Sequence, residues 1–112
     1  MTKLIVAKFG GSAIGVDGIS IPLVVERINE LKKDSKVIGV FSAPLTTIDG
    51  KPRSLTDVIL EQGVKAEKGG SFSLDSVESC YKKILELTKN ENKENCQKII
   101  NSSLDISKKA LD

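Results

Sequence analysis

The chain begins with a short aliphatic run that ends in a lysine and a glycine pair, and this stretch constrains the fold most. Residues 4–7 (Leu-Ile-Val-Ala) are rich in branched side chains, which is typical of a strand covered on both faces in a parallel sheet. Lys8 follows at the carboxyl end of this strand, just before Gly10 and Gly11. Glycines permit backbone conformations closed to other residues and let N–H groups approach a ligand closely. The stretch 3–15 therefore predicts a strand whose end meets an anion such as phosphate.

The spacing alone also fits a simpler interpretation, in which a strand ends in glycines and its lysine is solvated. Two known phosphate motifs are excluded. No Gly-Lys-Ser/Thr follows, as a Walker A loop requires, and Gly10 and Gly11 are adjacent, which does not fit the dinucleotide-binding fingerprint.

Composition narrows the classes of function. The 112 residues form one small domain with a modest core, and a net charge of +2 indicates neither a nucleic-acid surface nor an acidic tail. Histidine and tryptophan are absent, which excludes histidine metal sites and histidine general bases. No apolar run approaches the ~20 residues of a membrane span. Cys80 and Cys96 lack further ligands, so we expect buried free thiols in a reducing cytoplasm.

The segments that follow predict a βαβ unit. Residues 14–18 form a loop, Ser20 caps a helix over 21–33 with Pro22 in its first turn, and its apolar stripe packs on the sheet. Residues 37–41 supply a second strand. A right-handed crossover opens both carboxyl ends on one side, where ligands bind in such sheets. Lys8, the glycine pair and Ser42-Ala43 should therefore border one crevice.

The rest of the chain predicts helices. Residues 44–53 form a polar loop with a turn at Asp49-Gly50, and Ser54 caps the next helix, with Leu55 and Val58 turned inward. Residues 69–73 are a break, Asp75 and Glu78 resemble a capping box, and residues 90–95 join the third helix to a fourth. These last two form an antiparallel pair. The prediction is α/β, with about two strands and four helices: a βαβ part over 1–53 and a helical segment over 54–112.

The string Lys8-Phe9-Gly10-Gly11-Ser12, after a single apolar strand, resembles the opening of aspartokinases in the amino-acid kinase family. The resemblance implies an amino-acid kinase-like amino-terminal part over 1–112. It also implies an enzyme that transfers the γ-phosphoryl group of ATP, with Mg²⁺, to the β-carboxylate of aspartate in lysine, threonine and methionine biosynthesis. In that case Lys8 is the catalytic cation on the phosphates, Gly10 and Gly11 supply N–H groups, and Ser12 lies between acceptor and phosphate.

The resemblance extends to the end of the second strand, where family members carry a Ser-Ala pair followed by a threonine near the substrate. Here the pair is Ser42-Ala43, and Thr46 or Thr47 is the corresponding hydroxyl. The likeness covers residues 1–65 and departs from the family at Ala13 and in the loop 44–49. The chain carries no nucleotide-binding lobe, so we expect a fragment that is inactive alone and is completed by that lobe in cis or in trans.

Two alternatives stay open. The chain is either a non-catalytic module that binds an anion or a partner lobe, or a kinase for another carboxylate, such as glutamate, or for a carbamate. The resemblance further implies a cytoplasmic protein with aspartate as its small-molecule substrate and a homodimer as a common family assembly. We expect neither nucleic acid nor a membrane as a partner, and no metal site formed by the chain's own residues.

Overall fold

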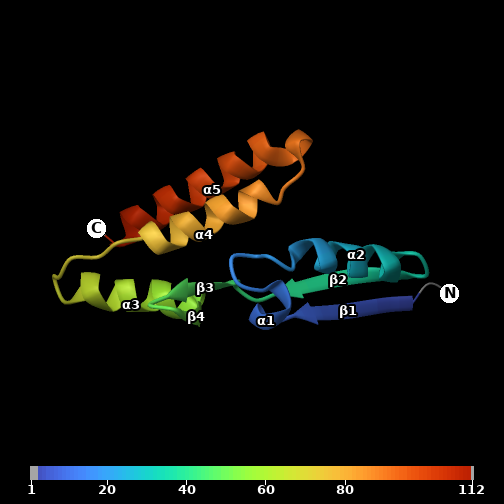
Figure 1. Ribbon diagram of the computed structural model, residues 1–112, viewed down its shortest axis with the longest axis horizontal. Helices are drawn as coiled ribbons and strands as arrows, with labels where there is room; N and C mark the ends of the chain where they lie inside the picture. The colour runs from blue at the N-terminus through green and yellow to red at the C-terminus, as the bar shows by residue number, and fades with distance from the viewer. Residues whose placement is uncertain (1–2, 112) are drawn as a thin grey trace.

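The computed structural model describes residues 3–111, which form four strands and five helices in an α/β arrangement (Figure 1). In chain order these are β1 (Lys3–Phe9), α1 (Gly11–Ile14), α2 (Ile21–Lys32), β2 (Ser35–Phe41), β3 (Leu45–Ile48), β4 (Lys51–Ser54), α3 (Leu55–Glu67), α4 (Asp75–Glu86) and α5 (Asn90–Leu111). The α/β class is confirmed. The expected two strands and four helices were too few, because the β3–β4 hairpin and the short α1 escaped the sequence patterns.

The predicted βαβ unit is confirmed. β1 and β2 pair in parallel, with Lys3 opposite Ser35 and Phe9 opposite Phe41, whose rings stack with centroids 5.5 Å apart. The connecting α2 begins after Ser20, although the Ser20 side chain forms no capping hydrogen bond. β2 begins earlier than expected because its polar first residues are held in the ladder by β1, and such pairing overrides a weak intrinsic strand preference.

The two faces of this sheet differ in a way that the sequence did not predict. α2 packs beside β2 and buries Val24, whereas Leu4 and Val6 on β1 are 63% and 64% exposed (Figure 1). The expectation that β1 is covered on both faces was wrong. Within residues 3–111 the chain supplies a helix to one face, and the aliphatic side chains of the other face are left in contact with solvent.

The segment expected to be a polar loop is a β-hairpin. β3 and β4 are antiparallel and are joined by Asp49-Gly50, both of which have positive φ angles, of 50° and 78°. A two-residue turn of this kind matches the twist of the flanking strands. Pro52 pairs with Thr47, the first pair after the one that flanks the turn. Opposite residues at this position exchange no backbone hydrogen bonds, so the missing N–H of proline costs the ladder nothing.

The glycines after β1 also differ from the prediction. Gly10 has an ordinary extended backbone with φ −75° and ψ 173°, so its conformation does not require glycine. Left-handed backbone occurs further along, at Gly15 and Gly18, with φ angles of 88° and 70°. α1 makes its single turn from Gly11 to Ile14 and ends just before Gly15.

The helical segment largely follows the sequence pattern, with two corrections at helix starts. Ser54 caps α3 as predicted, by accepting a hydrogen bond from the Thr56 N–H at 3.2 Å. The expected capping box at the start of α4 was wrong: Leu74 holds the cap position, and the Asp75 N–H donates instead to the Ser73 hydroxyl at 3.2 Å. Residues 90–95 were expected to be a linker but belong to α5, because their polar side chains suit the exposed face of a helix.

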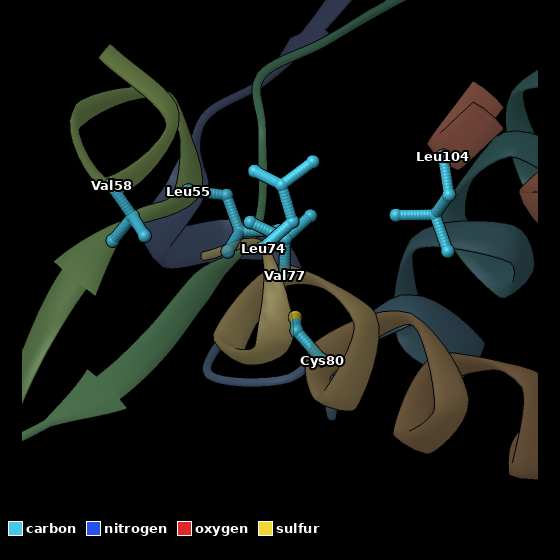
Figure 2. Packing of buried hydrophobic residues seen from close by; sticks show 6 residues of the cluster. All are labelled: Leu55, Val58, Leu74, Val77, Cys80 and Leu104. Atoms are coloured by element: carbon cyan, nitrogen blue, oxygen red, sulfur yellow. The ribbon is translucent and has the colours of Figure 1, made fainter. Parts of the chain in front are cut away.

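The main core lies between the helices and excludes the parallel sheet. Its buried members come from α3, α4, α5 and the residue preceding α4 (Figure 2): Leu55, Val58, Leu74, Val77, Cys80 and Leu104. α4 and α5 form the predicted antiparallel pair (Figure 1). The Cα radius of gyration is 16.2 Å, against ~13 Å for a compact domain of similar length. The described chain is therefore elongated, with the βαβ unit at one end of its long axis.

In residues 3–111, no helix combines the length and apolarity needed to cross a membrane.

The two cysteines should differ sharply in reactivity. Cys80 is fully buried, whereas Cys96 is partly exposed, so the expectation of a buried thiol holds for Cys80 alone. Burial, together with the nearby Asp17 carboxylate, raises the pKa of the Cys80 thiol to about 11. The thiolate is the reactive form. We expect an aromatic disulfide reagent at pH 8 to label Cys96 in the folded protein and Cys80 only after unfolding.

The control is Cys96→Ser, which leaves Cys80 as the single thiol and should react at least ~100-fold more slowly when folded than in denaturant. Fast labelling of folded Cys96→Ser would contradict the burial of Cys80.

Candidate functional site

A hollow of about 540 Å³ lies where the carboxyl ends of β1 and β2 meet the β3–β4 hairpin. It contains four of the residues predicted to form the site, Gly11, Ser12, Ser42 and Ala43, which come from two segments about 30 residues apart in sequence. The complete lining consists of Gly11, Ser12, Phe41, Ser42, Ala43, Leu45, Ser54 and Thr56. The predicted crevice therefore exists at the strand ends, and its walls are rich in hydroxyl groups.

The two segments are held together by backbone contacts. The Ser42 N–H donates to the Phe9 carbonyl at 2.9 Å, which extends the parallel pairing by one residue beyond β2. A Cβ atom on Gly11 would lie 3.2 Å from the Ala43 carbonyl oxygen and 3.2 Å from Leu45 Cδ2. A side chain on Gly11 would thus crowd Ala43 and Leu45, so glycine is favoured there by close approach and not by an unusual φ. Gly10 has no atom within 4 Å of the position that a Cβ would take, and it does not line the hollow.

Ser54 and Thr56 line the hollow but were not predicted as site residues. In the sequence, Ser54 was interpreted only as a helix cap, and in the structure its hydroxyl does accept the Thr56 N–H. The hairpin brings both into the site, since its register sets Ser54 opposite Leu45. The Asp49-Gly50 turn was the available signal: counting pairs outward from a two-residue turn gives this register.

Three other predicted residues lie outside the lining. Lys8 is exposed at the end of β1, opposite Val40, and does not border the hollow. Thr47 is exposed on the hairpin, whereas Thr46 is buried. The structure therefore brings together Gly11, Ala43 and both serines of the prediction, and leaves Lys8, Gly10 and both threonines out of the hollow.

Thr46 belongs instead to a polar cluster behind the site. Its hydroxyl donates to Asp17 Oδ1 at 2.9 Å, and Lys83 Nζ donates to Asp17 Oδ2 at 3.2 Å. Burial raises the pKa of Asp17, but the hydrogen bonds from Thr46 and Lys83 outweigh it and hold the pKa below its usual value. The carboxylate is consequently charged and doubly bound. No sequence motif marked Asp17 or Lys83, because they are 66 residues apart.

This cluster positions one wall of the hollow. The Asp17 N–H donates to the Leu45 carbonyl at 2.6 Å, and Val16 and Leu45 form an isolated parallel bridge. Since Leu45 lines the hollow, the loop 15–19 holds the start of β3 in place from behind. Asp17 also connects this loop to α4 through Lys83.

We expect Asp17→Asn to lower the free energy of unfolding by about 1–2 kcal/mol at pH 7, because it removes the charge that Lys83 and Thr46 bind. Asparagine tolerates the positive φ of 53° at this position, so the backbone should not change. The pKa of Asp17 is lower in the folded chain than in the unfolded one, where it is ~3.9. Its contribution to stability is therefore present above about pH 4 and is lost as the pH falls through the folded-state pKa.

Urea unfolding of wild type and Asp17→Asn at a series of pH values measures this effect, with Asp105→Asn on the exposed face of α5 as the matched control. A difference between wild type and Asp17→Asn that stays constant down to pH 2 would contradict a charged, bound Asp17.

No protein-family model, curated protein or solved structure matches this chain. The resemblance of residues 8–12 to aspartokinases therefore stays a prediction from sequence. The function proposed for the chain rests on that string and on the geometry of the hollow.

The lining limits what the hollow can hold by itself. None of its residues carries a charged side chain. Within residues 3–111, no three His, Cys, Asp or Glu side chains form a group that could hold a metal ion. The lining does not fit a triphosphate with Mg²⁺, which needs cationic and carboxylate groups. Hydroxyls fit a smaller anion, because each can donate one hydrogen bond to a carboxylate or phosphoryl oxygen.

The charged residues of the hairpin are engaged elsewhere or lie in solvent. Arg53 Nη1 contacts Glu61 Oε2 at 2.8 Å, an ion pair between β4 and the exposed face of α3. Lys51 and Asp49 are exposed beside the turn. The Arg53–Glu61 pair joins the hairpin to α3, and Asp49, Lys51 and Arg53 do not border the hollow.

Proposed function

We propose that the chain provides the acceptor-binding part of an aspartate kinase, with the carboxylate of aspartate held in the hollow at the strand ends. The single observation that carries the proposal is the meeting of Gly11, Ser12, Ser42 and Ala43 in one hollow. The resemblance to aspartokinases assigns Ser12, Ser42 and Ala43 to the acceptor side and Gly11 to the phosphates, and these residues come from two separate segments.

The chemistry of the lining supports an acceptor rather than a nucleotide. Ser12 and Ser42 border the hollow from the ends of β1 and β2. Hydrogen bonds to an ionised carboxylate are stronger than neutral ones, so a few hydroxyl donors suffice to orient it. Orientation is what a kinase of this type must supply, because phosphoryl transfer proceeds by positioning and charge stabilisation without a covalent enzyme intermediate.

In this proposal, ATP and Mg²⁺ are held by a nucleotide-binding lobe in cis or in trans. Lys8 lies near the end of β1, three residues before Gly11, which lines the hollow. It would serve the phosphates from that lobe's side. We place the proposed enzyme in amino-acid biosynthesis in the cytoplasm, as a homodimer, on the strength of the resemblance alone.

Binding of L-aspartate to the isotope-labelled chain, followed by NMR, tests the acceptor site. We expect amide shifts to centre on Gly11, Ser12 and Ser42. Ser42→Ala should weaken binding by roughly five- to tenfold, since the loss of one hydrogen bond is worth about 1 kcal/mol or slightly more. Ser71→Ala, at an exposed position between α3 and α4, is the matched control and should leave binding unchanged. Shifts confined to residues outside the lining would refute the acceptor site.

Turnover tests the kinase part separately. ADP formation from ATP and magnesium, with and without aspartate, should be absent in the chain alone and appear when a nucleotide-binding lobe is added. Lys8→Ala should then abolish it. Aspartate-dependent turnover by the chain alone that is lost in Lys8→Ala would show that residues 1–112 assemble a complete site. It would contradict the need for a separate nucleotide-binding lobe.

A second candidate is favoured by the uncharged lining. A hollow without a cation suits a non-catalytic module that binds a small anion or a partner lobe and performs no transfer. Titration with inorganic phosphate, glutamate and carbamate beside aspartate separates these cases. Equal binding of all anions without turnover would favour the module, and a preference for glutamate or carbamate would favour a kinase with another acceptor.

A further inference from the structure

The face of the parallel sheet opposite α2 presents a continuous aliphatic surface. It consists of Leu4, Val6, Ile38 and Val40, which are 63%, 64%, 51% and 44% exposed, and which we call the open sheet face. The register sets Val6 directly opposite Ile38, so the four side chains from β1 and β2 lie on the same side. The alternate residues Ile5, Ala7 and Val37 point to the other side and are partly buried.

This pattern is unusual for a sheet face in water. One-sided sheets alternate apolar and polar residues, whereas parallel strands with aliphatic side chains on both faces are typical of sheets covered on both sides. The exposure of four neighbouring aliphatic side chains therefore marks a surface that binds something.

The size of the open sheet face decides between a helix and a second copy of the chain. Its side chains expose on the order of 300–400 Å². A specific interface buries about 800 Å² on each partner, so the face by itself fits a weak contact with a short segment and not a stable dimer. Its length from Leu4 to Lys8 is ~13 Å, and two strands ~5 Å apart are covered by a single helix of ~10 Å diameter. Two to three turns of one helix thus match it.

Two lysines bound this face and define the charge of its occupant. Lys8 lies opposite Val40 at one end, and Lys36 lies opposite Leu4 at the other. Both are exposed, and neither belongs to an ion pair formed within residues 3–111. A second copy would bring its own lysines against these, which like-charge repulsion disfavours. A helix with carboxylates at both ends of its apolar stripe would pair with them.

We propose that the open sheet face binds an amphipathic helix of a partner protein whose apolar stripe is bounded by acidic residues. The helix runs along the two strands β1 and β2. It covers Val6 and Ile38 with its apolar side chains and pairs its carboxylates with Lys8 at one end and Lys36 at the other. This proposal does not rest on the acceptor site, since it concerns a face of the sheet and not the hollow at its end. It shares Lys8 with the proposed phosphate contact, so a bound helix and the phosphates would compete for that side chain.

A synthetic helical peptide of about 14 residues, with leucines at helical spacing and a glutamate at each end of the stripe, is the probe. Fluorescence anisotropy measures its binding to the full chain. We expect Val6→Asp to weaken binding at least roughly tenfold, because it sets a carboxylate under the apolar stripe. Leu23→Asp is the matched control: Leu23 is 66% exposed on α2 and should leave binding unchanged.

Ile38→Thr is a second variant that keeps a β-branched side chain suited to a strand, and it should weaken binding without unfolding the protein. The double variant Lys8→Glu with Lys36→Glu should reverse the preference, so that a peptide with lysines at the ends of its stripe binds better than the acidic one. Circular dichroism checks the fold of each variant.

Three results would overturn the proposal. These are equal binding of the acidic and basic peptides to wild type, equal weakening by Val6→Asp and Leu23→Asp, and a dimer in sedimentation that Val6→Asp dissociates. Aspartate binding at Ser12 and Ser42 is measured by separate NMR signals, so failure of either proposal is distinguishable from failure of the other.

Discussion

Leu55→Ala should lower the free energy of unfolding by about 3–5 kcal/mol, the largest effect that we expect from a single substitution in this chain. Leu55 is 1% exposed and lies where α3 meets α4, in contact with the buried cluster that includes Leu74 and Val77 (Figure 2). Truncation removes buried methyl groups and leaves a cavity that neighbouring helices cannot fill without moving. A loss of this size is a large fraction of the ~5–15 kcal/mol that stabilises a typical domain.

Leu60→Ala is the matched control, because Leu60 lies on the same helix and is 62% exposed. It should change the free energy of unfolding by less than ~0.5 kcal/mol. Urea unfolding followed by circular dichroism measures both variants. Similar losses for the two substitutions would mean that α3 is not anchored by Leu55.

Gly18→Ala is expected to cost about 2–4 kcal/mol, because glycine is required there for two reasons. Its φ of 70° is a left-handed conformation that strains other residues. A Cβ at this position would also lie 2.7 Å from Ile21 Cδ1 and 2.7 Å from Ile84 Cγ1, which is closer than atoms can pack. Gly18 therefore allows the loop before α2 to approach Ile84 on α4, and alanine should push this loop and α4 apart.

Gly50→Ala separates strain from crowding. Gly50 has a similar φ of 78° but no atom within 4 Å of the position that a Cβ would take, so only the backbone strain of ~1 kcal/mol should appear. Thermal and urea unfolding of the two variants give the difference. If Gly50→Ala is as damaging as Gly18→Ala, the contact with Ile84 contributes nothing. If Ile84→Ala restores part of the loss in a Gly18→Ala background, the contact is demonstrated directly.

Local patterns predicted those elements that local forces decide. The branched run 4–7 and the stripe of α2 gave the βαβ unit, because hydrophobic periodicity and parallel pairing act within about 40 residues. Ser54 was identified as a cap because capping depends on neighbours two positions away. The turn at Asp49-Gly50 was predicted, but the strands on either side of it were not. Pro52 and the polar residues around it have low strand propensity, so the segment was interpreted as a loop.

The candidate site was predicted in part for the same reason. Gly11, Ser12, Ser42 and Ala43 follow two parallel strands, and topology alone brings such strand ends together. Ser54 and Thr56 enter through the hairpin register, and Lys8 stands outside because strand alternation turns it to the open sheet face. The bond between Asp17 and Lys83 joins residues 66 positions apart, and no local pattern contains it.

The sequence by itself determined the α/β class, the parallel pair with its crossover helix, the antiparallel helices at the carboxyl end, and the meeting of the two strand ends that line the hollow. These follow from spacings of two, three and four residues, which the backbone converts directly into faces and turns. Only the tertiary structure decided which faces are covered. It buried Cys80 and Leu104 together in a helical core, and it left Val6 and Ile38 open to solvent. Burial depends on what packs from elsewhere in the chain, and an aliphatic strand carries the same pattern whether or not a second layer covers it.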